Sequence, residues 1–259
     1  MNESPQKRIL VLMPCLNEAE SVKNVIQSVK KHLPSADIIV VDDGSSDATG
    51  SVAQSAGAKI LRHVSAHGVG AALETGYLYA LRNNYDVVLQ LDGDGQHPAD
   101  KLPDLLEHLL NDSADIVIGS RYLDKADRSE TAIIRKVGHK LFSGLIFLVT
   151  GLKFTDPTSG FRGLSKRALT FFAGGVFPCD YPDSDVILMA YFSGLRIREV
   201  SVIMYPRSKG ASQHSGVIRP IYYGMKMMLA MLMVLLNLNL WKRWRREHAL
   251  EKLNPAERN

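Results

Sequence analysis

The sequence predicts an open α/β fold, a mostly parallel sheet with helices on both faces. In the first 120 residues, short apolar runs rich in Ile, Val and Leu alternate with amphipathic stretches. Strand–helix alternation at this spacing is typical of parallel strands joined by right-handed crossovers. The chain has 259 residues, 46% hydrophobic and 22% charged. That length and composition exclude a disordered or collagen-like chain and suffice for a large core.

The apolar runs are four to six residues long and end in turn residues, as expected for strands buried on both faces. The predicted strands are Ile9–Met13, Asp37–Val41, Ala58–Arg62, Val87–Leu91 and Asp115–Gly119. The stretches between them have apolar residues at intervals of three and four, so that each stretch would form a helix with a single apolar face. The predicted helices are Ser21–His32, Asp47–Ser55, Gly68–Asn83 and Ala99–Leu110.

After residue 120 the alternation loosens. We expect an apolar helix over Ile133–Thr150, a helix over Asp183–Ser193 and a strand over Arg196–Met204. Turn residues predict a polar loop over Asp156–Arg162 and a second loop, rich in Ser, Gly and Lys, over Pro206–Gly216.

Polar clusters follow three of the predicted strands, at Pro14–Glu18, Asp42–Ser45 and Asp92–Asp94. In open α/β sheets, ligands bind beyond the carboxyl ends of the strands. We therefore expect the three clusters to form one site. Neither G-x-G-x-x-G after the first strand nor G-x-x-x-x-G-K-[ST] occurs, which disfavours a dinucleotide-binding dehydrogenase and a P-loop NTPase.

Asp92-Gly93-Asp94 is the sharpest of these clusters. Two carboxylates separated by one glycine can hold a divalent cation against phosphates. Oxygen ligands favour Mg²⁺ or Mn²⁺, and Gln96 could add a carbonyl oxygen. The alternative is an ordinary Asp-Gly turn at a strand end.

Taken together, the motifs resemble the family 2 glycosyltransferases with the GT-A fold, and most closely their dolichol-phosphate mannose synthase-like branch. The resemblance covers residues 8–213, with the motifs in the family's order, and predicts a catalytic domain over 1–213 and a tail over 214–259. The motifs are Pro14-x-x-Asn17-Glu18, Val41-Asp42-Asp43-Gly44-Ser45-x-Asp47-x-Thr49, Leu91-Asp92-Gly93-Asp94-Gly95-Gln96-His97-Pro98 and Gly119-Ser120-Arg121-Tyr122.

The resemblance implies roles for the acidic clusters. Asp42 and Asp43 would bind the base and ribose of a nucleotide sugar, and the loop with Pro14, Asn17 and Glu18 would close over the base. The metal ligands implied on the diphosphate are Asp92, Asp94 and Gln96, whereas His97 would shape the loop.

The resemblance also implies four arginines for the phosphates of donor and acceptor: Arg121, Arg135, Arg162 and Arg207, the last in a segment that includes Ser212. Guanidinium groups bind phosphate bidentately. A surface salt bridge is the alternative for each. Gln213 stands where mannose synthases commonly have lysine, which leaves the sugar open.

The resemblance also implies a catalytic carboxylate after the sheet, for which Asp185 is the best candidate and Asp183 the second. Both precede the apolar run that begins at Val186. A phosphate monoester is already anionic at neutral pH, so a lipid-phosphate acceptor needs no strong base, and Asp185 would then orient the acceptor. Both residues could instead cap a helix.

Residues 217–241 are nearly all apolar, and the ten from Met227 to Leu236 lack any polar side chain. Ten helical residues span about 15 Å, half of a bilayer's hydrocarbon core. Residues 242–259 carry six Lys or Arg and three Glu, a net +3 out of the chain's +4. Trp241 and Trp244 beside these cations predict a helix that lies on an anionic membrane surface. A core helix or a dimer interface is the alternative.

The sequence and the resemblance together predict a metal-dependent, inverting glycosyltransferase. It would transfer a hexose from a UDP-, GDP- or dTDP-sugar to polyprenyl phosphate. Two cysteines and no evident leader favour the cytoplasm, with the chain peripheral on the inner face of the membrane. A saccharide hydroxyl acceptor is the second hypothesis, and a non-catalytic nucleotide-sugar-binding scaffold the third. A small membrane protein or a second copy are the partners considered. Nucleic acid is disfavoured, because residues 1–241 carry a net charge of only +1.

Overall fold

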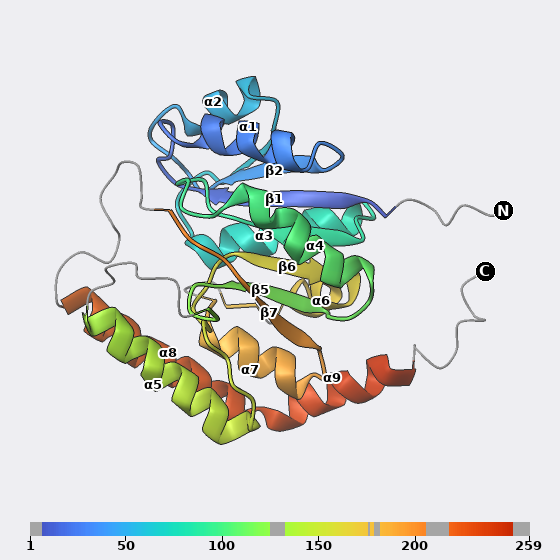
Figure 1. Ribbon diagram of the computed structural model, residues 1–259, viewed down its shortest axis with the longest axis vertical. Coiled ribbons are helices and arrows are strands. Elements are labelled where there is room, and N and C mark those ends of the chain that lie inside the picture. The colour runs from blue at the N-terminus through green and yellow to red at the C-terminus, as the bar shows by residue number, and fades with distance from the viewer. Residues whose placement is uncertain (1–6, 125–132, 176, 179–181, 206–217, 251–259) are drawn as a thin grey trace.

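The computed structural model describes residues 7–124, 133–175, 177–178, 182–205 and 218–250 (Figure 1). Its core is a seven-stranded sheet of order β3-β2-β1-β4-β6-β5-β7. The strands are β1 (Ile9–Cys15), β2 (Asp37–Asp42), β3 (Lys59–Arg62), β4 (Val87–Gln90), β5 (Ile116–Ser120), β6 (Arg162–Ser165) and β7 (Ile197–Ser201). All pairings are parallel except those of β6 with β4 and β5. The predicted fold class is confirmed.

Helices cover both faces of the sheet (Figure 1). They are α1 (Val22–His32), α2 (Thr49–Ser55), α3 (Val69–Arg82), the short 3₁₀ helix η1 (Ala99–Lys101), α4 (Leu102–Leu110), α5 (Ile133–Thr150), α6 (Lys166–Phe172), α7 (Ser184–Phe192), α8 (Ile218–Leu236) and α9 (Leu238–Leu250). Successive side chains of β1 point to opposite faces of the sheet. Leu10 and Leu12 pack in the core that also contains α3 and α6. Val11 and Met13 pack in the core on the other face, which contains α1 and α4.

Two elements, β6 and α6, were absent from the sequence prediction, which assigned Arg162 to the end of a polar loop. β6 is short and has no apolar run. It inserts antiparallel between β4 and β5, where Gly163 leaves no room for a side chain: an added Cβ would lie 2.7 Å from a methyl carbon of Leu109.

The apolar C-terminal segment forms two helices, not the single helix predicted. α8 and α9 meet at Asn237 with a bend of 60°. At the bend, the Asn237 N–H donates to the carbonyls of Met233 and Val234, each at 3.2 Å, and the Trp241 indole N–H also donates to the carbonyl of Val234, at 2.9 Å. Within the described residues, no single helix is long and apolar enough to span a membrane. The bent pair of α8 and α9 reaches that length and apolar composition only when the two helices are taken together.

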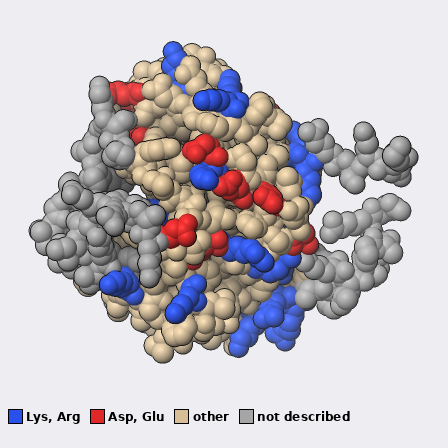
Figure 2. Space-filling model, in the orientation of Figure 1, with Lys and Arg blue, Asp and Glu red and all other residues tan. Residues whose placement is uncertain are grey.

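The described part of α8 has one face in the core and another exposed. Met227, Met231 and Val234 are buried, at helical spacing, in the same core as α5 and α7. Met225 and Leu229 belong to a set of exposed apolar side chains on the other face. α8 lies beside α5, and Lys and Arg side chains gather over α9 (Figures 1 and 2). Thus the segment belongs in part to the core and also exposes apolar surface, and its predicted contact with a membrane stays a prediction.

Candidate active site

The three polar clusters come together, as predicted, where β1, β2 and β4 end. The Asp43 N–H donates to the carbonyl of Cys15 at 2.9 Å, which joins the ends of β2 and β1. An added Cβ at Gly160 would lie 3.7 Å from an oxygen of Asp92, so the loop before β6 approaches the end of β4. One edge of the sheet therefore carries the acidic groups.

Hydrogen bonds join the loop after β1 to the loop after β2. Asn17 adopts a left-handed backbone conformation (φ 57°), and its side-chain oxygen accepts the N–H of Ser46 at 2.8 Å. The Glu18 N–H donates to the Thr49 hydroxyl at 2.8 Å. Pro14 lies within β1 itself, buried and paired with Val41. Asn17 and Glu18 are thus held beside the second cluster, and their predicted contact with a nucleobase stays a prediction.

Asp42 and Asp43 are both buried but differ in their partners. Asp43 accepts the backbone N–H groups of His67 and Gly68 at 3.0 and 2.8 Å and lies 2.7 Å from His63 Nδ1. Asp42 Oδ1 accepts the Ser45 N–H at 2.9 Å, and its Oδ2 forms an ion pair with Arg62, whose Nε lies 3.5 Å away. Protein groups therefore engage both carboxylates, and their predicted contacts with the base and ribose of a nucleotide stay predictions.

The Asp92–Gln96 turn is held by its own backbone and by His97. Asp94 Oδ1 accepts the Gln96 N–H at 3.0 Å, and the Asp92 N–H donates to His97 Nδ1 at 2.9 Å. Burial lowers the pKa of His97 to about 4, so its ring is neutral at pH 7 and accepts this bond. His97 therefore shapes the loop, as the sequence predicted.

Among the described residues, no group of three or more His, Cys, Asp or Glu side chains is placed to hold a metal ion. Asp92 and Asp94 alone supply two carboxylates at this turn. Mg²⁺ and Mn²⁺ are commonly held by one or two carboxylates, waters and substrate phosphates, so the donor set fits an ion completed by a diphosphate.

Arg121 is fixed by a carboxylate that the sequence analysis missed. Its Nε and Nη2 donate to the two oxygens of Asp156 at 2.6 and 2.8 Å, a bidentate pair. Asp156 is fully buried, and Glu199 on β7 accepts the N–H groups of Thr155 and Asp156 at 2.8 to 2.9 Å. These bonds hold the Arg121 guanidinium in place at the end of β5, and its Nη1 atom takes no part in them.

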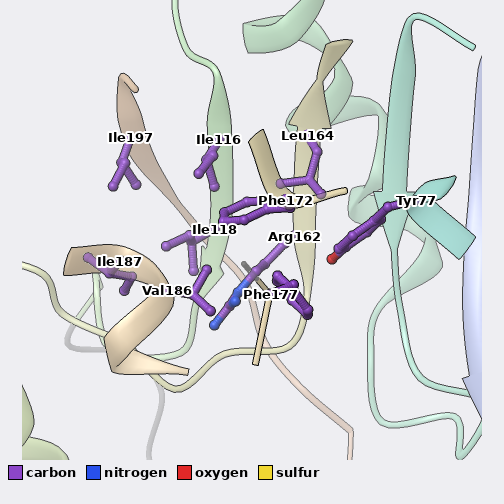
Figure 3. A pocket seen from close by; sticks show the side chains of 10 residues that line it. All are labelled: Tyr77, Ile116, Ile118, Arg162, Leu164, Phe172, Phe177, Val186, Ile187 and Ile197. Atoms are coloured by element: carbon purple, nitrogen blue, oxygen red, sulfur yellow. The ribbon is translucent and has the colours of Figure 1, made fainter. Parts of the chain in front are cut away.

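Arg162 lies on β6, 3% exposed, among the apolar side chains of a small cavity that includes Tyr77, Phe177 and Val186 (Figure 3). Its Nε and Nη1 donate to the carbonyls of Ser159 and Pro182 at 2.7 and 2.9 Å. This burial does not present the guanidinium to solvent, so its predicted contact with an acceptor phosphate stays a prediction.

Asp183 and Asp185 stand at the start of α7. Asp185 is 3% exposed, its Oδ1 accepts the N–H groups of Asp183 and Val186, and burial raises its pKa to about 6. Asp183 Oδ1 lies 3.9 Å from Arg162 Nη2, and its Oδ2 accepts the hydroxyl of Tyr223 on α8. The two candidate bases therefore sit between the sheet and the apolar C-terminal helix.

Three other predicted residues cannot be placed by side chain. Arg135 is in the first turn of α5, where only the backbone is described. Arg207 and Ser212, with Gln213, lie outside the described residues.

The sequence analysis missed His63, Asp156, Glu199 and Tyr223 as site residues. The sequence offered no signal for Asp156, which lies in the same loop as Arg162 but pairs with Arg121, 35 residues earlier in the chain. His63, Glu199 and Tyr223 lie in segments without a motif.

Comparisons with known proteins identify the family of this chain. The model of "Glycosyl transferase family 2" matches residues 10–171. An undecaprenyl-phosphate mannosyltransferase of Micrococcus luteus is 32% identical over 223 residues, 82% of this chain and 89% of that one. A UDP-N-acetylglucosamine–dolichyl-phosphate N-acetylglucosaminyltransferase of Methanococcus voltae is 30% identical over 214 residues, 76% of this chain and 85% of that one.

A crystal structure of glucosyl-3-phosphoglycerate synthase from Mycobacterium tuberculosis, in complex with Mn²⁺ and UDP-glucose, has a similar fold. The TM-score is 0.62 at 23% identity, and the match covers 88% of this chain and 78% of that one. With the acidic groups gathered at one edge of a mostly parallel sheet, and a family match over more than half of its length, this chain belongs to glycosyl transferase family 2.

Proposed function

We propose that this protein transfers a hexose from a nucleotide sugar to the phosphate of a polyprenyl phosphate, at the cytoplasmic face of a membrane. The observation that carries the proposal is the placement of α8. One side of this helix reaches Asp183 at the candidate site, and another side exposes apolar residues that include Met225 and Leu229. An acceptor whose phosphate must enter the site while its chain stays in lipid requires such a neighbour.

The acceptor phosphate attacks the anomeric carbon directly, and the nucleoside diphosphate leaves from the opposite face, with inversion. The phosphate monoester is anionic at neutral pH and needs no deprotonation by a strong base. Arg121, held by Asp156, supplies positive charge near the phosphates. Asp42 and Asp43, where β2 ends, would bind the base and ribose of the nucleoside.

A divalent ion, Mg²⁺ or Mn²⁺, would be held by Asp92 and Asp94 with an oxygen of Gln96, and would neutralise negative charge that develops on the leaving diphosphate. The similar M. tuberculosis structure contains Mn²⁺ together with UDP-glucose, which supports a divalent ion as the cofactor. The sugar is left open, because the named relatives include a mannosyltransferase and an N-acetylglucosaminyltransferase.

The second candidate function is transfer to a saccharide hydroxyl. The pKa of about 6 at Asp185 favours it, because a general base works best with a pKa near the operating pH. Asp185 would then take the proton from the hydroxyl.

The test is incubation with a panel of radiolabelled nucleotide sugars, with undecaprenyl or dolichyl phosphate in detergent or vesicles, followed by extraction into organic solvent. Label in the organic phase supports the lipid acceptor. Label that stays in water-soluble oligosaccharide supports the second function. Donor binding without any transfer would favour the scaffold hypothesis.

A further inference from the structure

A basic groove of about 660 Å³ lies between β7, the C-terminal end of α7 and α9. Its lining includes Arg196, Arg198, Lys242 and Arg245, with Tyr191 and Phe192 among the wall residues. Arg196 and Arg198 stand at the start of β7, whereas the candidate active site lies where the parallel strands end. The basic groove is therefore a separate site.

Three of its four cations are available to a ligand. Arg196 is bound to Asp112 and Asp115, at 2.5 and 3.0 Å. For Arg198, Lys242 and Arg245, no carboxylate lies within 4.0 Å among the described residues. Exposed cations with no acidic partner around one concavity attract an anion.

Arg245 lies close to the turn that follows α7. Gly194, in that turn, has φ +74°, and a Cβ added there would lie 2.8 Å from Arg245 Nε. The positive φ favours glycine at this position. Arg167 donates to the Gly194 carbonyl at 3.1 Å, which reduces the negative character of the helix end beneath the groove.

Leu152 lines the groove, and two further exposed apolar side chains lie near its lining residues in the sequence. Leu152 is 46% exposed and follows Leu148 on α5, which is 81% exposed. Leu240 on α9 is also exposed, two residues before Lys242. A ligand with a phosphate and adjoining hydrocarbon matches this combination of cations and exposed apolar side chains.

We infer that the basic groove binds the headgroup phosphate of an anionic phospholipid, through Arg198, Lys242 and Arg245. The inference rests on the proposed membrane location and is independent of the sugar and of the transfer reaction. Bound there, the lipid would anchor the end of the molecule opposite the active site and fix the orientation of α5 and α8 on the membrane.

The test uses the full chain and three variants that each remove one exposed positive charge: Arg198→Gln, Arg245→Gln and the control Arg246→Gln. Arg246 is adjacent to Arg245 on α9 but does not line the groove. One measurement is co-sedimentation with phosphatidylcholine vesicles with and without phosphatidylglycerol. The other is calorimetric titration with short-chain phosphatidylglycerol below its micelle concentration.

We expect the wild type and Arg246→Gln to bind the short-chain lipid with similar affinity, and Arg198→Gln and Arg245→Gln to bind it at least tenfold more weakly, because charge-assisted bonds to phosphate are lost. Equal losses of affinity in all three variants would indicate binding by diffuse surface charge and would contradict a specific site in the groove. Displacement of the lipid by an equal concentration of inorganic phosphate would show that the groove binds free phosphate and would contradict phospholipid binding. If the full chain binds no vesicle of either composition, the proposed membrane location fails, whatever the transfer assay gives.

Discussion

The hydroxyl of Tyr223 donates a hydrogen bond to the carboxylate of Asp183, across 40 residues of sequence. Tyr223 belongs to α8, and its ring also packs edge-on against Phe142 of α5, with centroids 6.4 Å apart. The other Asp183 oxygen faces Arg162 Nη2 at 3.9 Å. The two helices that expose apolar surface are thus tied to the polar groups at the start of α7.

Tyr223→Phe should therefore lower transfer to long-chain polyprenyl phosphate by about tenfold, because a hydrogen bond to a charged group contributes roughly 1.5–3 kcal/mol. We expect the effect mainly in KM for the acceptor, with KM for the nucleotide sugar unchanged. Tyr222→Phe removes the same hydroxyl from the adjacent exposed position and should behave as wild type. Identical kinetics for the two variants would show that the Tyr223 bond does not influence the acceptor site.

Asp185 should make stability depend on pH. Its pKa is raised from 3.8 to about 6 by burial, so the folded protein retains this proton at pH values where the unfolded chain has lost it. Stability should accordingly fall as pH rises from about 4 to 6, by up to about 3 kcal/mol, and stay low above that window.

Asp185→Asn keeps an oxygen for the N–H groups of Asp183 and Val186 but carries no charge. Its Tm should exceed that of the wild type by roughly 5 °C at pH 8, and the two should converge near pH 4. Thermal unfolding across pH 4–8 measures this. A constant difference between the two proteins at every pH would rule out the buried carboxylate as the cause.

Asp94→Asn should reduce transfer by about 10²-fold while the fold is kept, since removal of one such electrostatic group costs roughly 3 kcal/mol of transition-state stabilisation. Mn²⁺ binding in the presence of nucleoside diphosphate, followed by electron paramagnetic resonance, should weaken in parallel. The control Asp100→Asn removes an exposed carboxylate six residues further on and should change neither quantity. Full activity of the wild type in EDTA would contradict the metal.

Trp241→Ala should destabilise the protein by about 3–5 kcal/mol, the usual cost of removing a buried aromatic side chain. Trp241 is buried against Phe171, with ring centroids 6.1 Å apart, and its indole N–H is bonded to Val234. Leu240→Ala alters the exposed neighbour and should cost little. Urea unfolding of both variants distinguishes a core role for this segment from a purely lipid-facing one, for which Trp241→Ala would leave stability unchanged.

The same packing changes what removal of the C-terminal segment should do. The sequence alone favoured a tail that the catalytic domain does not need. Met227, Met231 and Val234 are instead buried in the core beside α5 and α7, so a chain ending before α8 would expose apolar surface. The division of the chain at residues 213 and 214 stays a prediction.

The sequence alone determined where the first five strands lie along the chain and which edge of the sheet carries the acidic groups. Strands buried on both faces must be apolar throughout, so β1, β2 and β4 stand out as runs such as Ile9–Met13, and parallel connections bring their carboxyl ends together. The family motifs lie at those ends and each consists of residues close together in the sequence, so they could be identified without a structure.

Tertiary structure alone decided the contacts between residues far apart in the chain. β6 has no periodic pattern of its own and exists because β4 and β5 offer backbone partners on both sides. Asp156 pairs with Arg121 across 35 residues. Whether an apolar helix side chain contacts the core or remains exposed depends on which side of α8 meets α5 and α7, and hydrophobicity is the same on both sides. Local sequence carries no information on such pairings, because their energy arises only when the folded chain removes both partners from water.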